Sequence, residues 1–127
     1  MEQTYDVIVP MTMNNLPVFR LNIEWMKKNL SWRRILVIGA EDLEKPVREL
    51  GAEFLSEDTL VPGMTLKNIR ACIEKRIGTG KRAGWYFQQF IKLGYAYCCE
   101  DEYYIVWDAD TIPLHMIPHM VDGHPVF

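Results

Sequence analysis

The stretch Tyr103-Tyr-Ile-Val-Trp-Asp-Ala-Asp110 decides how this chain folds. Its first five residues are aromatic or β-branched, the residue types that fit a pleated strand best. Two aspartates follow at once, and Pro113 prevents a regular continuation of the strand. We therefore expect a strand over residues 103–107 that runs into a loop carrying Asp108 and Asp110.

Strand and helix patterns alternate upstream of that stretch. Residues 5–10 form a short β-branched run that ends at a proline, and residues 17–30 repeat apolar side chains at helical spacing. Residues 34–39 contain a continuous apolar run after Arg34, as in a strand covered on both faces. A short helix is expected from about Pro46 until Gly51 ends it. The chain thus opens with two strand-helix units.

The middle of the chain continues the alternation. Residues 52–57 predict a third strand, and a helix with one apolar face should follow Pro62 and end at Gly78. A further helix is expected over residues 84–98. Its aromatic side chains, together with one from the first helix, are predicted to be buried core; these residues are Phe87, Phe90, Tyr97 and Trp25.

Alternating strands and helices predict an α/β fold with a mostly parallel sheet, helices on both faces and a Rossmann-like order. The 127 residues are enough for one compact domain, so we expect a single domain over 1–127. No dinucleotide-binding glycine fingerprint follows the first strand, and no complete phosphate-binding P-loop is present.

Composition limits the classes of function. The chain is 49% hydrophobic and 24% charged, which indicates a globular protein. Its formal net charge is −3 and its basic residues are scattered, so a nucleic-acid surface is not expected. No apolar run is long enough for a transmembrane segment, and the start lacks a signal peptide. Three cysteines without CxxC spacing indicate reduced, buried thiols, and hence a cytoplasmic protein.

Asp108 and Asp110 are the first candidates for chemistry. In open α/β sheets, ligands bind beyond the carboxyl ends of the strands, where these two residues are predicted to lie. Carboxylates one residue apart can share a hard cation such as Mn²⁺ or Mg²⁺, with phosphate and water oxygens completing its shell. Such an ion would neutralise a diphosphate leaving group as a Lewis acid. Asp-X-Asp alone is a weak signal, because aspartate is common in surface turns.

Two segments carry a resemblance to a known family. The stretch Tyr104-Ile-Val-Trp-Asp-Ala-Asp-Thr-Ile-Pro-Leu114 resembles the Asp-X-Asp segment of GT-A glycosyltransferases. The stretch Lys81-Arg-Ala-Gly-Trp-Tyr-Phe-Gln-Gln-Phe-Ile-Lys-Leu-Gly-Tyr95 looks like the helix that precedes this motif in bacterial GT-A-like proteins. With a looser similarity in the opening strand, the resemblance covers roughly residues 5–114.

This resemblance implies a metal-dependent transferase that uses a nucleoside-diphosphate sugar as donor. Asp110 would be a direct metal ligand, and Asp108 would serve the metal or the ribose. The loop after the first strand, including Pro10 and Thr12, would cradle the nucleoside. The acceptor is unknown; a cell-surface glycan precursor, met at the inner face of the membrane, is one candidate.

The helix before the motif adds donor-binding candidates. Trp85, Gln88, Gln89 and Lys92 are three or four residues apart along it, which makes a polar stripe that could meet sugar or phosphate groups. Arg82 at the helix start could bind a phosphate. A solvated helix face and a mobile surface loop are the competing interpretations.

Three alternatives stay open. The chain could be a domain truncated before its acceptor side, which binds the donor without catalysis; an α/β interaction module; or a nucleotidyltransferase, which also uses paired aspartates and a metal. Residues 120–127 look like a turn entering a strand that is cut short, and Asp122 is a weak candidate for a general base. An incomplete sheet would leave an exposed edge that promotes homo-oligomers.

Overall fold

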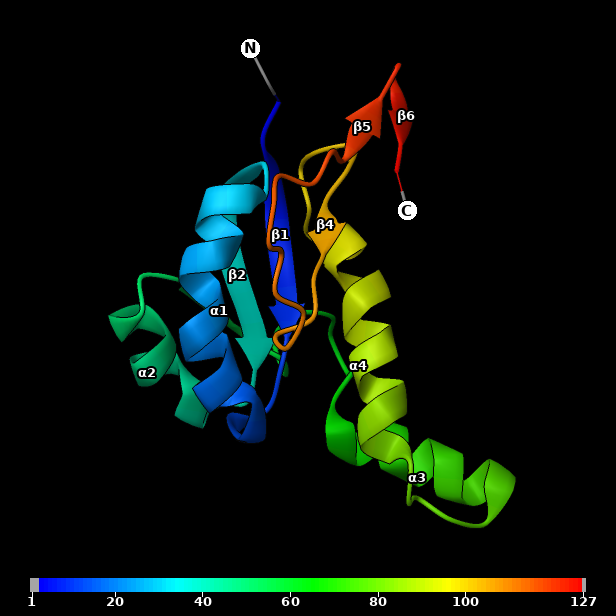
Figure 1. The fold of residues 1–127 in the computed structure, drawn as a ribbon. Helices are drawn as coiled ribbons and strands as arrows, with labels where there is room; N and C mark the ends of the chain where they lie inside the picture. Colours follow the sequence, from blue (N-terminus) through cyan, green and yellow to red (C-terminus); the bar gives the residue numbers. More distant parts are fainter. Residues whose placement is uncertain (1–2, 127) are drawn as a thin grey trace.

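The computed structural model describes residues 3–126 and contains a four-stranded parallel sheet (Figure 1). Its strand order is β3-β2-β1-β4, and every neighbouring pair is parallel. The strands are β1 (Tyr5–Pro10), β2 (Trp32–Gly39), β3 (Glu53–Ser56) and β4 (Ile105–Val106). The fold is therefore α/β and Rossmann-like, as the sequence predicts.

One face of the sheet packs against the helices that follow β1 and β2. Successive side chains of a strand point to opposite faces, and Val7 and Val9 of β1 belong to the core cluster on this side. The α1 helix (Leu16–Asn29) follows the short η1 turn (Met13–Asn15), and α2 (Glu44–Glu49) follows η2 (Glu41–Leu43). They contribute the buried side chains of Phe19, Ile23, Met26 and Val47.

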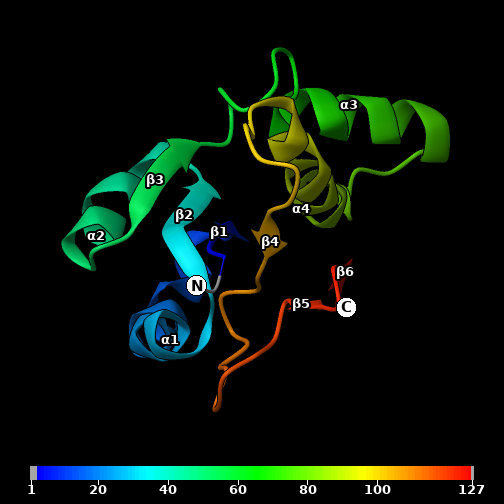
Figure 2. The ribbon, with the colours of Figure 1, turned by 90° about the horizontal axis from the view of Figure 1, so that it is seen from above.

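The opposite face is covered by the second pair of helices. Ile8, the residue between Val7 and Val9, packs here with Phe87 and Ile91. These side chains come from α4 (Ala83–Gly94), which continues into η3 (Tyr95–Tyr97). Figure 2 shows α1 and α2 on one side of the strands and α3 and α4 on the other. Helices on both faces are thus confirmed.

The α3 helix (Leu66–Ile77) packs against α4 and extends away from the sheet (Figure 1). Thr65 caps its first turn by accepting a hydrogen bond from the Asn68 N–H at 3.1 Å. Gly78 ends it in the left-handed conformation at φ 89°. None of its residues is fully buried, and the side chain of Ile77 is 61% exposed.

The carboxyl ends of β1 and β4 lie side by side. The chain proceeds outward from β1 to β2 and β3, then crosses back to place β4 on the other side of β1. This reversal of strand order is a topological switch point, where open α/β sheets bind ligands. The Trp107 N–H extends the pairing by donating to the Ile8 carbonyl at 3.0 Å. Asp108 therefore follows directly at this point.

A small antiparallel hairpin forms the last described part of the chain. It consists of β5 (Met120–Val121) and β6 (His124–Pro125), with Asp122 and Gly123 at positive φ in the turn. It lies at the amino end of the sheet, where the rings of His119 and Tyr5 meet edge to face at 6.5 Å. The expected turn and strand are present, although Phe127 lies outside the described residues.

Several burial predictions are wrong. Phe87 is core, but Trp25, Phe90 and Tyr97 are 40%, 43% and 71% exposed, because each helix has more apolar positions than its packed face can cover. Cys72 and Cys98 are exposed as well. Regular pairing in β4 covers two residues instead of the expected five. Over residues 3–126, no helix combines the length and apolar character needed to cross a membrane.

Candidate functional site

The Asp108–Thr111 turn presents two carboxylates at the end of β4. The Thr111 N–H donates to the Asp108 carbonyl at 3.1 Å, and the Trp107 indole N–H donates to the Thr111 carbonyl at 2.6 Å. Ala109 is 4% exposed, whereas Asp108 and Asp110 on either side of it are exposed. The turn is thus anchored in the core by Ala109, while the side chains of Asp108 and Asp110 are exposed to solvent.

Two buried asparagines of α1 hold this turn and the segment after it. The Asn22 side-chain amide donates to the carbonyls of Ala109 at 3.0 Å and Thr111 at 2.9 Å. The Asn29 amide donates to the Pro113 carbonyl at 2.6 Å. Buried carbonyls require hydrogen-bond donors, and these side-chain amides supply them from the neighbouring helix. The sequence interpretation missed both residues, although two asparagines seven positions apart beside an apolar helix stripe were a usable signal.

A cleft of about 340 Å³ lies between α4, the start of α3 and the segments that follow β1 and β3. Three of the predicted donor-binding residues line it: Thr12, Trp85 and Gln88. Other lining residues are Met11, Glu57, Leu66, Gly84, Phe87 and Ile91. Its buried lining residues Met11, Phe87 and Ile91 are apolar, and Thr12, Glu57 and Gln88 add polar groups, as expected for a small-molecule site.

Glu57 is a cleft residue that the sequence interpretation missed. Its N–H donates to the Gly39 carbonyl at 2.9 Å, which fixes it just beyond β3 and β2. Burial raises the pKa of the Glu57 carboxyl, and the negative charges of Asp58 and Asp42 raise it further. Its place after a parallel strand was the signal that could have identified it.

Lys92 of α4 contacts the Asp108 turn. It lies one helical turn after Gln88 on the same face of α4, and its ammonium is 3.5 Å from Asp108 Oδ1. The Lys92 side chain is 26% exposed and that of Asp108 is 59% exposed. The Lys92 ammonium and the Asp108 carboxylate thus form a partly exposed ion pair at the end of β4.

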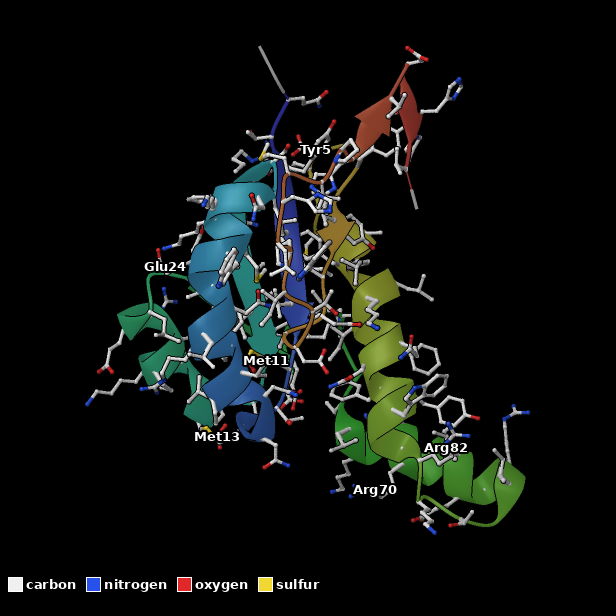
Figure 3. The ribbon with its side chains drawn as sticks, viewed as in Figure 1. Tyr5, Met11, Met13, Glu24, Arg70 and Arg82 are labelled. Carbon is white, nitrogen blue, oxygen red and sulfur yellow. The ribbon has the colours of Figure 1, made fainter. Side chains whose placement is uncertain are left out.

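Pro10 and Arg82 are not among the residues that line the cleft. Pro10 is buried as the last residue of β1, and the Thr12 N–H donates a hydrogen bond to Asn15 Oδ1 at 3.0 Å. Figure 3 places Met11 beyond the end of β1 and Arg82 at the start of α4. The Arg82 guanidinium lies 5.1 Å from the centroid of the Trp85 ring.

Neither Arg82 nor Gln89 lines the cleft. The Gln89 amide donates to the Trp85 carbonyl at 3.5 Å within its own helix. The predicted polar stripe therefore divides in two: Trp85, Gln88 and Lys92 face the carboxyl end of the sheet, whereas Gln89 turns along the helix surface.

The donor set of the turn fits a hard divalent cation. Asp108 and Asp110 provide carboxylate oxygens one residue apart, and no hydrogen bond or ion pair engages the Asp110 carboxylate within residues 3–126. The same residues contain no group of three His, Cys, Asp or Glu side chains arranged to hold a metal. The chain alone thus offers two ligands, and an ion bound here would take its other ligands from phosphate and water.

Asp122 cannot serve as a general base at this site. It lies in the β5–β6 turn at the amino end of the sheet, whereas Asp108 follows the carboxyl end of β4 (Figure 1). A base must approach within hydrogen-bond distance of the hydroxyl that it deprotonates. The hypothesis for Asp122 is wrong for this geometric reason.

Comparison with known proteins gives one family. Neither the curated proteins nor the solved structures contain a match to this chain. Residues 23–122 match a family of unknown function, DUF6492, and the match includes α4, β4 and the Asp108–Thr111 turn. Because this match extends over most of its length, the chain belongs to the family of unknown function DUF6492.

Proposed function

We propose that this chain binds a nucleoside-diphosphate sugar through a divalent metal and acts as the donor-binding domain of a glycosyltransferase. The observation that carries the proposal is the location of Asp108 and Asp110 at the switch point between β1 and β4, where Asp108 contacts Lys92 of α4, the helix that also lines the cleft. A ligand there can place its nucleoside in the cleft and its diphosphate beside the turn.

Electrostatics favours a metal in this arrangement. Glu57, Asp108 and Asp110 bring three carboxyl groups to the site, and Lys92 brings one ammonium. A diphosphate would meet net negative charge, which a divalent cation between the aspartates would offset. When bound, such an ion would stabilise the charge that develops on the leaving diphosphate. The two aspartates would hold it, and Asn22 would keep their turn in place.

Calorimetric titration with UDP and GDP, each in Mn²⁺ and in EDTA, tests this proposal. The expected result is binding that Mn²⁺ strengthens, with a Mn²⁺-dependent part that weakens at least tenfold in Asp110→Asn. Asp122→Asn is the matched control, because it makes the same change at the other end of the sheet. Unchanged metal-dependent binding in Asp110→Asn, or equal losses in both variants, would refute the proposed site.

A donor-binding domain without transfer chemistry is the second candidate. It is favoured by the position of Asp122, which removes the base candidate that the sequence offered. Saturable nucleotide-sugar binding without hydrolysis or transfer across a panel of acceptors would support it. Transfer to any acceptor would exclude it. The cytoplasmic location and the identity of the acceptor stay predictions from the sequence.

A further inference from the structure

Lys92 is a cation whose position the metal-binding hypothesis does not explain. Its ammonium lies 3.5 Å from Asp108 Oδ1, on one of the two carboxylates expected to hold a metal. Ion pairs are possible at this distance, but a normal N–H···O hydrogen bond is shorter. Lys92 therefore neutralises Asp108 without being locked to it.

The surroundings of Lys92 keep its ammonium near the turn. Its side chain is 26% exposed, so much of the stem is covered by neighbouring atoms. The Lys92 carbonyl accepts a hydrogen bond from the Tyr104 hydroxyl at 2.6 Å, which ties this part of α4 to the segment leading into β4. The helix and the aspartate turn are thus fixed relative to each other.

We propose that the Lys92 ammonium is a built-in cation of the diphosphate site. When no ligand is bound, it pairs with Asp108, where a metal would otherwise bind. When a diphosphate enters, the ammonium moves from Asp108 and pairs with the phosphate oxygens. This inference rests on the proposed function and adds a metal-independent component to it. No bond is made or broken; one ion pair is exchanged for another.

The exchange is physically easy. Asp108 is 59% exposed, and an ion pair screened by water to that degree contributes little to stability, so the ammonium leaves it at small cost. Phosphate oxygens offer a lysine ammonium a stronger, charge-assisted partner. Gln88, one turn earlier on the same face and lining the cleft, places a ligand within reach of Lys92.

Two effects of opposite sign follow for Lys92→Met. Removing the ammonium should weaken the binding of inorganic pyrophosphate in EDTA at least tenfold, since the site then has only carboxylates. It should also strengthen Mn²⁺ binding without nucleotide about threefold or more, because the metal no longer competes with an internal cation. A residue that only stabilises the fold would change both affinities in the same direction.

Asp108→Asn provides the complementary test. It releases Lys92 and removes one negative charge, so pyrophosphate binding in EDTA should strengthen while the Mn²⁺-dependent part of UDP and GDP binding is lost. Lys92→Arg keeps the charge and should retain most of the metal-free pyrophosphate binding. Lys45→Met, on the exposed surface of α2 at the other face of the sheet, is the control and should change neither affinity.

Calorimetry measures pyrophosphate in EDTA, and water-proton relaxation measures Mn²⁺ alone. The proposal is overturned if wild type binds pyrophosphate in EDTA no more tightly than Lys92→Met, or if that variant fails to bind Mn²⁺ more tightly. Failure of the proposed function would give a different result: UDP and GDP would not bind to wild type even with Mn²⁺, and this would be so with or without the Lys92 substitution.

Discussion

Carboxylates at the two ends of the parallel sheet differ in burial and in hydrogen bonding. At the amino end, the Asp6 carboxylate is 4% exposed and receives the Tyr95 hydroxyl at 2.6 Å and the Arg33 guanidinium at 2.6 Å. Arg34 approaches it at 3.3 Å, and Arg33 also contacts Asp101. At the carboxyl end, Asp108 lies 3.5 Å from the Lys92 ammonium, and Asp110 is exposed.

This difference indicates that Asp6 stabilises the fold, whereas Asp108 and Asp110 can bind a ligand. Burial acts to raise the pKa of Asp6, but the hydrogen bonds from Tyr95 and Arg33 and the nearby positive charges outweigh it and hold the pKa below its ordinary value. A carboxylate stabilised in this way has no capacity left for a ligand. The exposed aspartates at the other end keep that capacity, which makes them the candidates for binding.

The largest expected effect is on stability at the amino end. Asp6→Ala leaves Arg33 and Tyr95 without their shared acceptor, and we expect the free energy of unfolding to fall by about 3 kcal/mol. Urea denaturation measures the loss. Mn²⁺-dependent nucleotide binding, assayed where the variant is still folded, should stay within about twofold of wild type. A stability change below about 0.5 kcal/mol would show that the network is not structural.

The next effect links stability with the binding end. Asn22→Ala removes both hydrogen bonds from α1 to the Asp108–Thr111 turn, so stability should fall by about 2 kcal/mol, or about 1 kcal/mol per bond. Nucleotide affinity in Mn²⁺ should fall about tenfold as the turn loosens. Arg20→Ala, exposed on the same helix, is the control for both measurements. Full affinity in the Asn22 variant would mean that the turn does not depend on its buried amide.

A smaller effect concerns pH. Burial, and then the hydrogen bond to Asp6, raise the pKa of Tyr95 to about 12 from its ordinary 10. The folded state thus favours the protonated hydroxyl, so this contribution is complete below pH 10 and is lost as the pH rises toward 12. By pH 11 the loss should be about 1 kcal/mol. Urea denaturation of wild type and Tyr95→Phe between pH 9 and 11 should show a steeper decline in wild type; parallel declines would contradict this assignment.

The smallest effects separate two residues of α4. Gln88→Ala removes a side chain that lines the cleft and should weaken UDP or GDP binding in Mn²⁺ about fivefold. Arg82→Ala should change it less than twofold, because Arg82 stacks on Trp85 outside the cleft lining. Calorimetry of both variants provides the comparison. A larger loss for Arg82 would reverse the assignment and place phosphate at the start of α4.

The strands, the helices and their order were predictable because they rest on local patterns. The apolar run of β2 and the stripe of α1 are visible in any short window, and parallel strands place Asp108 at the carboxyl edge once the alternation is recognised. Prediction failed for Phe90 and Tyr97, because spacing identifies an apolar residue but not how wide a face the neighbouring elements cover.

The polar partners could not be predicted, because they join residues far apart in the chain. Tyr95 reaches Asp6 and Asn22 reaches Ala109, each across more than eighty residues. Periodicity carries no information at such separations. The roles of Glu57 and Lys92 were predictable only in part. The sequence shows that Glu57 follows a strand and that Lys92 belongs to a polar helix stripe. The fold was needed to show that Glu57 lines the cleft and that Lys92 lies near Asp108.

The most direct measurement is paramagnetic broadening of amide signals by Mn²⁺ in the presence of UDP or GDP, observed by NMR on the isotopically labelled chain. The metal should broaden the signals of Thr12, Gln88 and Ala109 most strongly and that of His124, in the hairpin at the amino end of the sheet, least. Asp110→Asn should abolish the selective broadening. Broadening centred on the hairpin or on the Asp6 network, or none at saturating nucleotide, would contradict a metal-diphosphate site at the carboxyl end.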